Sequence, residues 1–277
     1  MTAALAFAGL TLDRPRLMGI VNVTPDSFSD GGRHLDPEVA IAAGERMAEE
    51  GADILDVGGE STRPGAAPVS LEEELARVLP VVRGLAARGH RVSIDTHHAY
   101  VMEAALEAGA AIVNDVTALT HEPQSLPTVA RWGASAVLMH MRGTPETMNR
   151  LTAYDDLVGD IAAYLAARLD ACRAAGIADD RLCIDAGVGF AKTAEQSAAL
   201  IAATPHFVRL GVAVLVGASR KSFIGRLSRG EPAGDRLPGS IAAAIAAAEA
   251  GAHFIRVHDV AETAQALRIW QAIRSSR

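Results

Sequence analysis

The sequence predicts an α/β fold, a single (β/α)8 TIM barrel over residues 1–277, in which residues 1–16 form a short N-terminal strand or plug. Apolar, β-branched runs alternate with helical stretches eight times, which indicates a parallel sheet with helical crossovers. A length of 277 residues is typical of one such barrel, and no linker divides the chain. Each predicted strand also ends in polar residues, as the mouth of a barrel requires.

The predicted elements follow one another in strict alternation. The strands cover residues 18–23, 53–57, 91–95, 111–115, 134–140, 181–185, 211–217 and 252–259. Helical patterns run over residues 37–50, 122–132, 154–175 and 194–203, and another runs from residue 70 to about residue 89. Two further helices end at residues 109 and 277, and one begins at residue 239. Gly51 is expected to end the first helix, and Ser70 with Glu73 predicts a capping box at the start of the second.

The alternative architecture is an open, doubly wound sheet. Such a sheet normally carries a glycine fingerprint directly after its first strand. The nearest match, GVGFAK at residues 187–192, comes late in the chain and lacks the third glycine, and GASRKS at residues 217–222 has the wrong spacing for a nucleotide P-loop. We therefore favour the barrel.

Composition narrows the class of protein. A hydrophobic content of 49% with only 4% aromatics predicts a core of Ala, Val, Leu and Ile. The net charge of −7 without a basic tail argues against nucleic acid as a partner, and no apolar run is long enough to span a membrane. Cys172 and Cys183, one in a predicted helix and one in a predicted strand, suit reduced thiols. We expect a cytoplasmic protein.

The polar strand ends are the candidate site. They lie at or just past predicted carboxyl ends, which converge on one face of a barrel. Arg256 and His258 are two residues apart, so on a strand they would point the same way and could meet a phosphate-like anion. The set comprises Asn22, Asp56, Asp95, Asn114, His140, Asp185, the group at residues 219–221, Arg256 and His258.

Each of these residues also has a structural explanation. A strand-end aspartate can cap a helix or form a salt bridge, and Arg256 could pair with a barrel carboxylate. His140, between two methionines, fits a packed histidine better than a metal ligand. His97 and His98 are adjacent and are expected to face apart, which disfavours a shared metal ion. Phe28, Phe190 and Phe223 fit the core better than a ligand platform when each is taken singly.

Eight stretches together carry a family resemblance. They are MGIVNVTPDSFSDGG, DVGGESTRPGA, SIDT, NDV, MHMRGTPETM, GVGFAK, VGASRKSFIG and GSIAAAIAAAEAGAHFIRVHDVAET. With them the chain resembles the dihydropteroate synthase family over nearly its whole length. The resemblance implies a barrel that condenses dihydropterin methyl diphosphate with 4-aminobenzoate, releases diphosphate, uses Mg²⁺ and forms a homodimer.

The resemblance also implies roles for matched residues. Asn22 would hold the Mg²⁺, Arg63, Arg256 and His258 would bind the diphosphate, and Lys221 would contact the pterin and face the amine. The pterin edge would be read by Asp95, Asn114 and Asp185, with Met139 and Phe190 lining the slot. The aminobenzoate pocket would be formed by Phe28, Thr62, Arg63, Pro64 and Ser222.

The chain departs from the family pattern at a few positions. His98 stands where family members usually carry Lys or Arg, and Ala186 where they usually carry Pro. Ala191 stands where Gly is often found, and Asn149 where Gln is common. Two other functions stay open at this point. One is a pterin-binding barrel of the corrinoid methyltransferase kind, which needs no diphosphate site. The other is a paralogue that binds pterin without catalysis.

Overall fold

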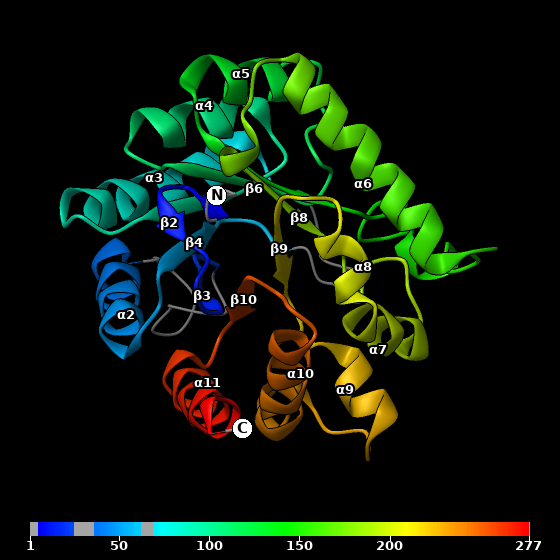
Figure 1. Cartoon of the computed structure of the whole chain (residues 1–277). Helices are drawn as coiled ribbons and strands as arrows, with labels where there is room; N and C mark the ends of the chain where they lie inside the picture. Colours follow the sequence, from blue (N-terminus) through cyan, green and yellow to red (C-terminus); the bar gives the residue numbers. More distant parts are fainter. Residues whose placement is uncertain (1–4, 25–35, 62–68, 277) are drawn as a thin grey trace.

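The computed structural model describes residues 5–24, 36–61 and 69–276. Eight parallel strands close into a barrel, and helices surround them (Figure 1). Around the barrel the order is β10-β3-β4-β5-β6-β7-β8-β9, which confirms the predicted fold. The strands are β3 (Arg16–Asn22), β4 (Ile54–Gly58), β5 (Val92–Asp95), β6 (Ile112–Asp115), β7 (Ser135–Met139), β8 (Leu182–Asp185), β9 (Ala213–Val216) and β10 (Phe254–Val257).

The helices cover the outside of the barrel. The principal ones are α2 (Pro37–Glu50), α3 (Leu71–Ala87), α4 (Ala99–Glu107), α5 (Ser125–Trp132), α6 (Leu157–Ala174), α7 (Ala194–Ala202), α10 (Leu237–Glu249) and α11 (Val260–Ser275). Two short helices, α8 (Thr204–Val208) and α9 (Ser222–Leu227), and three 3-10 turns, η1 (Met148–Arg150), η2 (Asp179–Arg181) and η3 (Ala233–Asp235), were not predicted. Their length gives them little periodicity to detect.

The predicted helix signals have mixed outcomes. Gly51 ends α2 in the left-handed conformation, with a φ of 119°. At the start of α3, the Ser70 hydroxyl accepts from the Glu73 amide at 3.2 Å, but the Glu73 carboxylate contacts Arg77 instead of returning to the cap. The predicted capping box is therefore only half present at Ser70.

The end of the barrel opposite the mouth is sealed by an apolar plug, as predicted. The hairpin of β1 (Ala6–Phe7) and β2 (Leu10–Thr11) lies across it (Figure 1). Phe7 is fully buried and meets the ring of Phe254 edge to face at 5.3 Å between centroids. It belongs to a buried cluster with residues from seven barrel strands, namely Met18, Ile54, Ile112, Val137, Cys183, Ala213, Leu215 and Phe254. Because the plug fills this end, a ligand must enter from the opposite one.

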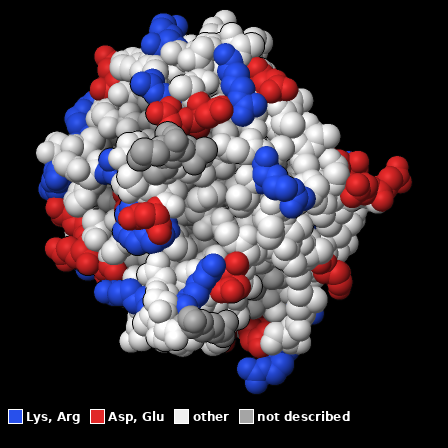
Figure 2. Space-filling model, in the orientation of Figure 1, with Lys and Arg blue, Asp and Glu red and all other residues white. Residues whose placement is uncertain are grey.

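The surface carries both signs of charge. Acidic and basic side chains are interspersed over the face seen in Figure 2. Among the described residues, no helix is both long and apolar enough to cross a membrane. Cys172 and Cys183 are both buried free thiols.

Candidate active site

Arg256 connects three strands at the mouth of the barrel. It lies on β10, and its Nε donates to Asp56 Oδ2 on β4 at 2.6 Å. Its Nη2 donates to Asp95 Oδ2, the last residue of β5, also at 2.6 Å. Burial alone would lower the pKa of Arg256, but the attraction of Asp56 and Asp95 overcomes it and raises the pKa. The guanidinium therefore stays charged, and the structure contains the pairing with barrel carboxylates that is the alternative explanation for Arg256.

The carboxylates around Arg256 are themselves strongly buried. Asp56 is fully buried, and its Oδ2 also accepts from Asn114 Nδ2 at 2.9 Å. Burial raises the pKa of Asp95 to about 7, even though Arg256 opposes the rise. We call Asp56, Asp95, Asn114 and Arg256 the arginine half of the mouth. It can present carboxylate and amide groups to a polar heterocycle and a cation to an anion.

A second group, on β7 to β9 and the loops after them, is the lysine half: His140, Asp185, Lys192 and Lys221. Lys192 is buried, and its Nζ donates to the Phe190 carbonyl at 2.7 Å and lies 3.2 Å from His140 Nδ1. Burial lowers the pKa of Lys192 to about 7, and it lowers the pKa of His140 to about 3 with help from Lys192. His140 is thus a packed neutral histidine, as predicted.

Lys221 faces the centre of the mouth from the residue before α9. Its Nζ donates to the Val188 carbonyl and lies 4.6 Å from the centroid of the Phe190 ring. Burial lowers the pKa of Lys221 to about 8, although Asp185 opposes this. Phe190 in turn packs with Met139 in a small buried cluster that also holds Val116, Met148 and Ala191. Lys221, Phe190 and Met139 therefore form one contiguous wall.

Asp185 ends β8 and begins a tight turn. Its Oδ1 accepts from the Gly187 amide at 2.7 Å, and burial raises its pKa although Lys221 opposes the rise. Gly187 has a φ of +73°, and a Cβ there would lie 2.0 Å from the His140 carbonyl oxygen. Only glycine fits this approach, so the turn after Asp185 is fixed without the proline that Ala186 replaces.

The two halves meet at Gly217, just past the end of β9. A Cβ on Gly217 would lie 3.8 Å from Arg256 Cβ and 3.9 Å from Asp185 Oδ2. The missing side chain leaves room between the arginine and the lysine half. His258, one residue past β10, lies beside Ser219, whose hydroxyl is 3.0 Å from His258 Nδ1 and accepts from the His258 amide at 3.2 Å. Ser219 thus fixes the position of His258.

Asn22, the predicted Mg²⁺ ligand, ends β3 opposite Gly58 and is partly exposed. Mg²⁺ takes hard oxygen ligands and is often held by one or two protein oxygens together with water and substrate phosphates. A partly exposed amide oxygen at the mouth fits this donor set. Asn22 is therefore compatible with Mg²⁺.

Several predicted residues are not placed with the rest. Phe28, Thr62, Arg63 and Pro64 lie outside the described residues. Ser222 is exposed at the first position of α9, next to Lys221. Asp115, which is not among the predicted site residues, has a structural role, because its carboxylate accepts from the amides of Thr117 and Leu119 and so shapes the turn after β6.

Sequence reasoning missed some residues of the site. Asp56 and Ser219 belong to the predicted set of polar strand ends but have no predicted role, and Lys192 is not in that set. A usable signal existed for Lys192, because the sequence contains only two lysines, Lys192 and Lys221, among its 26 basic residues. Both lie in the lysine half.

The expectation that His97 and His98 face apart is wrong. Their ring centroids are 4.1 Å apart. Side chains alternate sides only along an extended strand, and these two residues lie in the loop between β5 and α4. His98 occupies the N-cap position of α4 without capping it, and its Nδ1 lies 3.0 Å from Glu122 Oε1.

Comparison with known proteins agrees with this geometry. Residues 18–258 match the family model described as pterin binding enzyme. The dihydropteroate synthase of Escherichia coli strain K12 is 46% identical over 269 residues, which are 97% of this chain and 95% of that protein. A structure of the Xanthomonas albilineans enzyme with 4-aminobenzoic acid has a TM-score of 0.91 and 50% identity and covers 99% of both chains. Another, in complex with 7,8-dihydropteroate, has a TM-score of 0.87 and 48% identity and covers 96% of this chain and 95% of that one.

The closed barrel, its polar mouth and the family match together define a pterin-binding barrel. The chain belongs to the pterin-binding enzyme family and, within it, to the dihydropteroate synthases.

Proposed function

We propose that this protein condenses (7,8-dihydropterin-6-yl)methyl diphosphate with 4-aminobenzoate to give 7,8-dihydropteroate and diphosphate. The observation that carries the proposal is the arrangement around Arg256, which places a buried cation among carboxylates and an amide at the mouth. Support also comes from the relatives, whose names are those of dihydropteroate synthases and whose structures include complexes with 4-aminobenzoic acid and 7,8-dihydropteroate.

Asp95, Asn114 and Asp185 would read the polar edge of the pterin. Asp95 and Asp185 end their strands, Asn114 is the last residue but one of β6, and all three are buried or nearly so. Carboxylate oxygens accept from ring N–H and amino groups. Lys221 would contact the pterin next to the flat wall of Phe190 and Met139. Specificity arises because a heterocycle without these donors would leave buried acceptors unpaired.

The diphosphate would be bound by Arg63, Arg256 and His258. A guanidinium that stays charged suits a leaving group whose negative charge grows during the reaction. Ser219 holds His258 next to the strand that carries Arg256. When bound at Asn22, Mg²⁺ would neutralise part of the charge on the diphosphate oxygens.

The reaction is a substitution at the pterin methylene carbon. The C–O bond breaks, its electron pair leaves with diphosphate, the aminobenzoate nitrogen forms the new C–N bond, and that nitrogen loses a proton. An aromatic amine is a weak nucleophile, so we infer that C–O cleavage runs ahead of C–N formation. Asp95 and Asp185 would then stabilise the electron-poor pterin. A rate that depends little on the basicity of substituted anilines supports this order, and a steep dependence contradicts it.

The aminobenzoate pocket would consist of Ser222 together with Phe28, Thr62, Arg63 and Pro64. The last four come from the two early stretches MGIVNVTPDSFSDGG and DVGGESTRPGA, which would order the second substrate and keep water from the reacting carbon. Ser222 follows Lys221 directly, so the amine would approach on the side of the lysine half. We further propose that the enzyme is a cytoplasmic homodimer.

The decisive experiment measures diphosphate release from the dihydropterin diphosphate with Mg²⁺, with and without 4-aminobenzoate. We expect release that requires aminobenzoate and that falls about 100-fold or more in Lys221→Ala. Arg226→Ala, which removes an exposed cation from the same short helix, is the matched control and should keep full activity. Pterin binding without turnover would instead indicate a non-catalytic paralogue, with His98 and Ala186 as the first residues to revert.

A further inference from the structure

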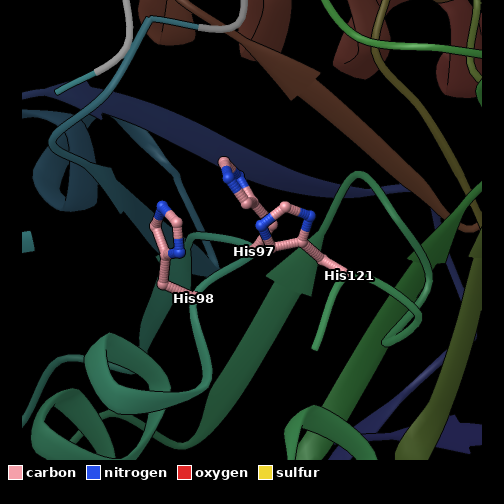
Figure 3. A group of neighbouring side chains, drawn as sticks. All are labelled: His97, His98 and His121. Atoms are coloured by element: carbon pink, nitrogen blue, oxygen red, sulfur yellow. The ribbon is translucent and has the colours of Figure 1, made fainter. Parts of the chain in front are cut away.

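Three histidines gather beside the mouth and have no role in the proposed reaction. His97 and His98 lie between β5 and α4, and His121 lies between β6 and α5, and the three rings come together in Figure 3. The ring centroids are 4.1 Å apart for His97 and His98, 4.4 Å for His97 and His121, and 5.4 Å for His98 and His121. One ring nitrogen of each lies within 4.8 Å of the others.

The environment favours imidazole rings that can act as ligands. Nδ1 of His98 lies 3.0 Å from Glu122 Oε1, so an N–H at that atom donates to the carboxylate and leaves Nε2 with a lone pair. A carboxylate that orients a histidine in this way is typical of metal-binding histidines. Burial lowers the pKa of His97 to about 4, with repulsion from His98 and His121 adding to the effect. His97 is therefore neutral near pH 7, as a metal ligand must be.

Two carboxylates, Glu60 and Glu74, also lie near the histidine cluster. Nδ1 of His97 lies 4.0 Å from Glu60 Oε2, and Glu60, Glu74 and His98 form a second cluster with metal-ligand spacing. Among the described residues, the buried Glu74 carboxylate has no hydrogen-bond partner of ordinary geometry. Burial raises its pKa, although Thr96 lies near enough to oppose the rise. A cation at this place would meet negative charge as well as ring nitrogens.

We propose that His97, His98 and His121 bind one Zn²⁺ ion, with the fourth position open to water or to Glu60. Imidazole suits Zn²⁺ and other late first-row metals, whereas Mg²⁺ prefers oxygen, so this site is distinct in chemistry from Asn22. Tetrahedral Zn²⁺ with Zn–N bonds of about 2.0–2.1 Å needs nitrogens roughly 3.3 Å apart. The side chains of His97 and His98 are 22% and 18% exposed, and the proposal requires ring rotations that bring the three nitrogens from within 4.8 Å of one another to that spacing.

Such an ion would connect the two loops that follow β5 and β6, the strands that carry Asp95 and Asn114 at the barrel mouth. His97 is two residues past Asp95, the end of β5, and His121 follows β6, which carries Asn114. A bond from each loop to one metal ion would fix the distance between them. The proposal itself concerns binding, and it stands or falls independently of the synthase reaction.

The test uses the full-length protein with any affinity tag removed and with metal stripped by a chelator. Co²⁺ is titrated as the probe, because a tetrahedral histidine site gives it intense visible absorption, and Zn²⁺ is then added as competitor. We expect one Co²⁺ per chain, displacement by one equivalent of Zn²⁺, and a higher melting temperature with Zn²⁺.

Two variants and a control sharpen the result. His121→Ala removes an exposed ligand and should weaken binding at least 100-fold, and Glu122→Gln should weaken it about 10- to 100-fold through the orientation of His98. His206→Ala, in α8 and away from the cluster, should bind as the parent does. Absence of tetrahedral Co²⁺ absorption in the parent, or equal binding by His121→Ala and the parent, would overturn the proposal. Melting of each metal-free variant checks that the fold is retained.

Discussion

The two halves of the barrel mouth handle buried positive charge in opposite ways. In the arginine half, Arg256 donates to Asp56 and Asp95 at 2.6 Å each, and its pKa is raised. In the lysine half, Lys192 and Lys221 donate to the carbonyls of Phe190 and Val188, and burial lowers their pKa values to about 7 and about 8. One half therefore holds a permanent charge, and the other holds amines that can lose theirs near neutral pH.

The difference follows from the chemistry of the two side chains. A guanidinium remains protonated even when buried, whereas an ammonium group shifts its pKa readily when it is desolvated. The sequence has 26 basic residues, of which only Lys192 and Lys221 are lysines, so arginine serves nearly everywhere else. Both lysines lie in the lysine half, where burial makes their charge sensitive to their surroundings. The permanent charge of Arg256 would suit the proposed diphosphate leaving group.

The largest effect is expected when the arginine half is broken. Arg256→Met leaves Asp56 and Asp95 buried without their cation, and breaking a buried pair costs about 3–5 kcal/mol in the free energy of unfolding. Urea unfolding followed by tryptophan fluorescence measures the loss. It should be larger at pH 8 than at pH 6, because burial raises the pKa of Asp95 to about 7 in the parent while Arg256 opposes the rise, and without Arg256 this pKa rises further. Between these pH values the folded parent releases a proton that the folded variant retains, so the variant loses more stability as the pH rises.

An exposed ion pair provides the control for this variant. Arg14 Nη2 lies 2.7 Å from Asp53 Oδ1, but the Arg14 side chain is 43% exposed and Asp53 keeps a second partner in Arg16. Arg14→Met should cost at most about 1 kcal/mol. Equal losses of stability for Arg256→Met and Arg14→Met would mean that the buried ion pairs of the arginine half stabilise the fold no more than an exposed pair does.

Much of the fold was predictable because it depends on local patterns. The barrel strands are apolar runs with buried side chains, so β4 was placed within one residue of its observed ends, and α2 was bounded by the pattern from Pro37 to Gly51. The short α8 was missed because five residues cannot display a helical period. Local signals therefore fix the long elements and fail for the short ones.

The site was less predictable because its contacts join distant parts of the chain. Arg256 bonds to Asp56 and Asp95, which are 200 and 161 residues away in sequence, and no spacing rule selects that pairing from the strand-end carboxylates. The His97 and His98 cluster was missed because alternation was applied to a loop. Strand ends identify which residues reach the mouth, but only the closed barrel determines which of them touch.

The second prediction concerns the lysine half directly. With 13C-labelled lysine, the chain should give two lysine Cε resonances, which titrate with pKa values of about 7 and about 8 instead of the usual value of about 10.4. Lys192→Arg assigns them, because only the Lys221 resonance remains. A lysine that titrates near the usual value would show that burial does not control that amine.

The same shifts predict a pH dependence of stability. Between about pH 7 and pH 10 the unfolded state binds more protons at Lys192 than the folded state, so this lysine makes stability rise with pH. The contribution is at most about 1.4 kcal/mol per pH unit. The free energy of unfolding of Lys192→Met, compared with that of the parent, should therefore give a difference that changes by up to about 1.4 kcal/mol per pH unit. A constant difference across this range would contradict the lowered pKa.

The smallest expected effect tests how His258 is positioned next to the arginine half. Ser219→Ala removes the hydroxyl that lies 3.0 Å from His258 Nδ1 and accepts from its amide, which should cost about 1 kcal/mol of stability. If His258 binds the diphosphate, KM for the pterin substrate should rise several-fold while KM for 4-aminobenzoate stays constant. Ser228→Ala, which removes a hydroxyl bonded to Glu231 on the surface, is the control. Identical stability and KM values for the two variants would show that His258 needs no support from Ser219.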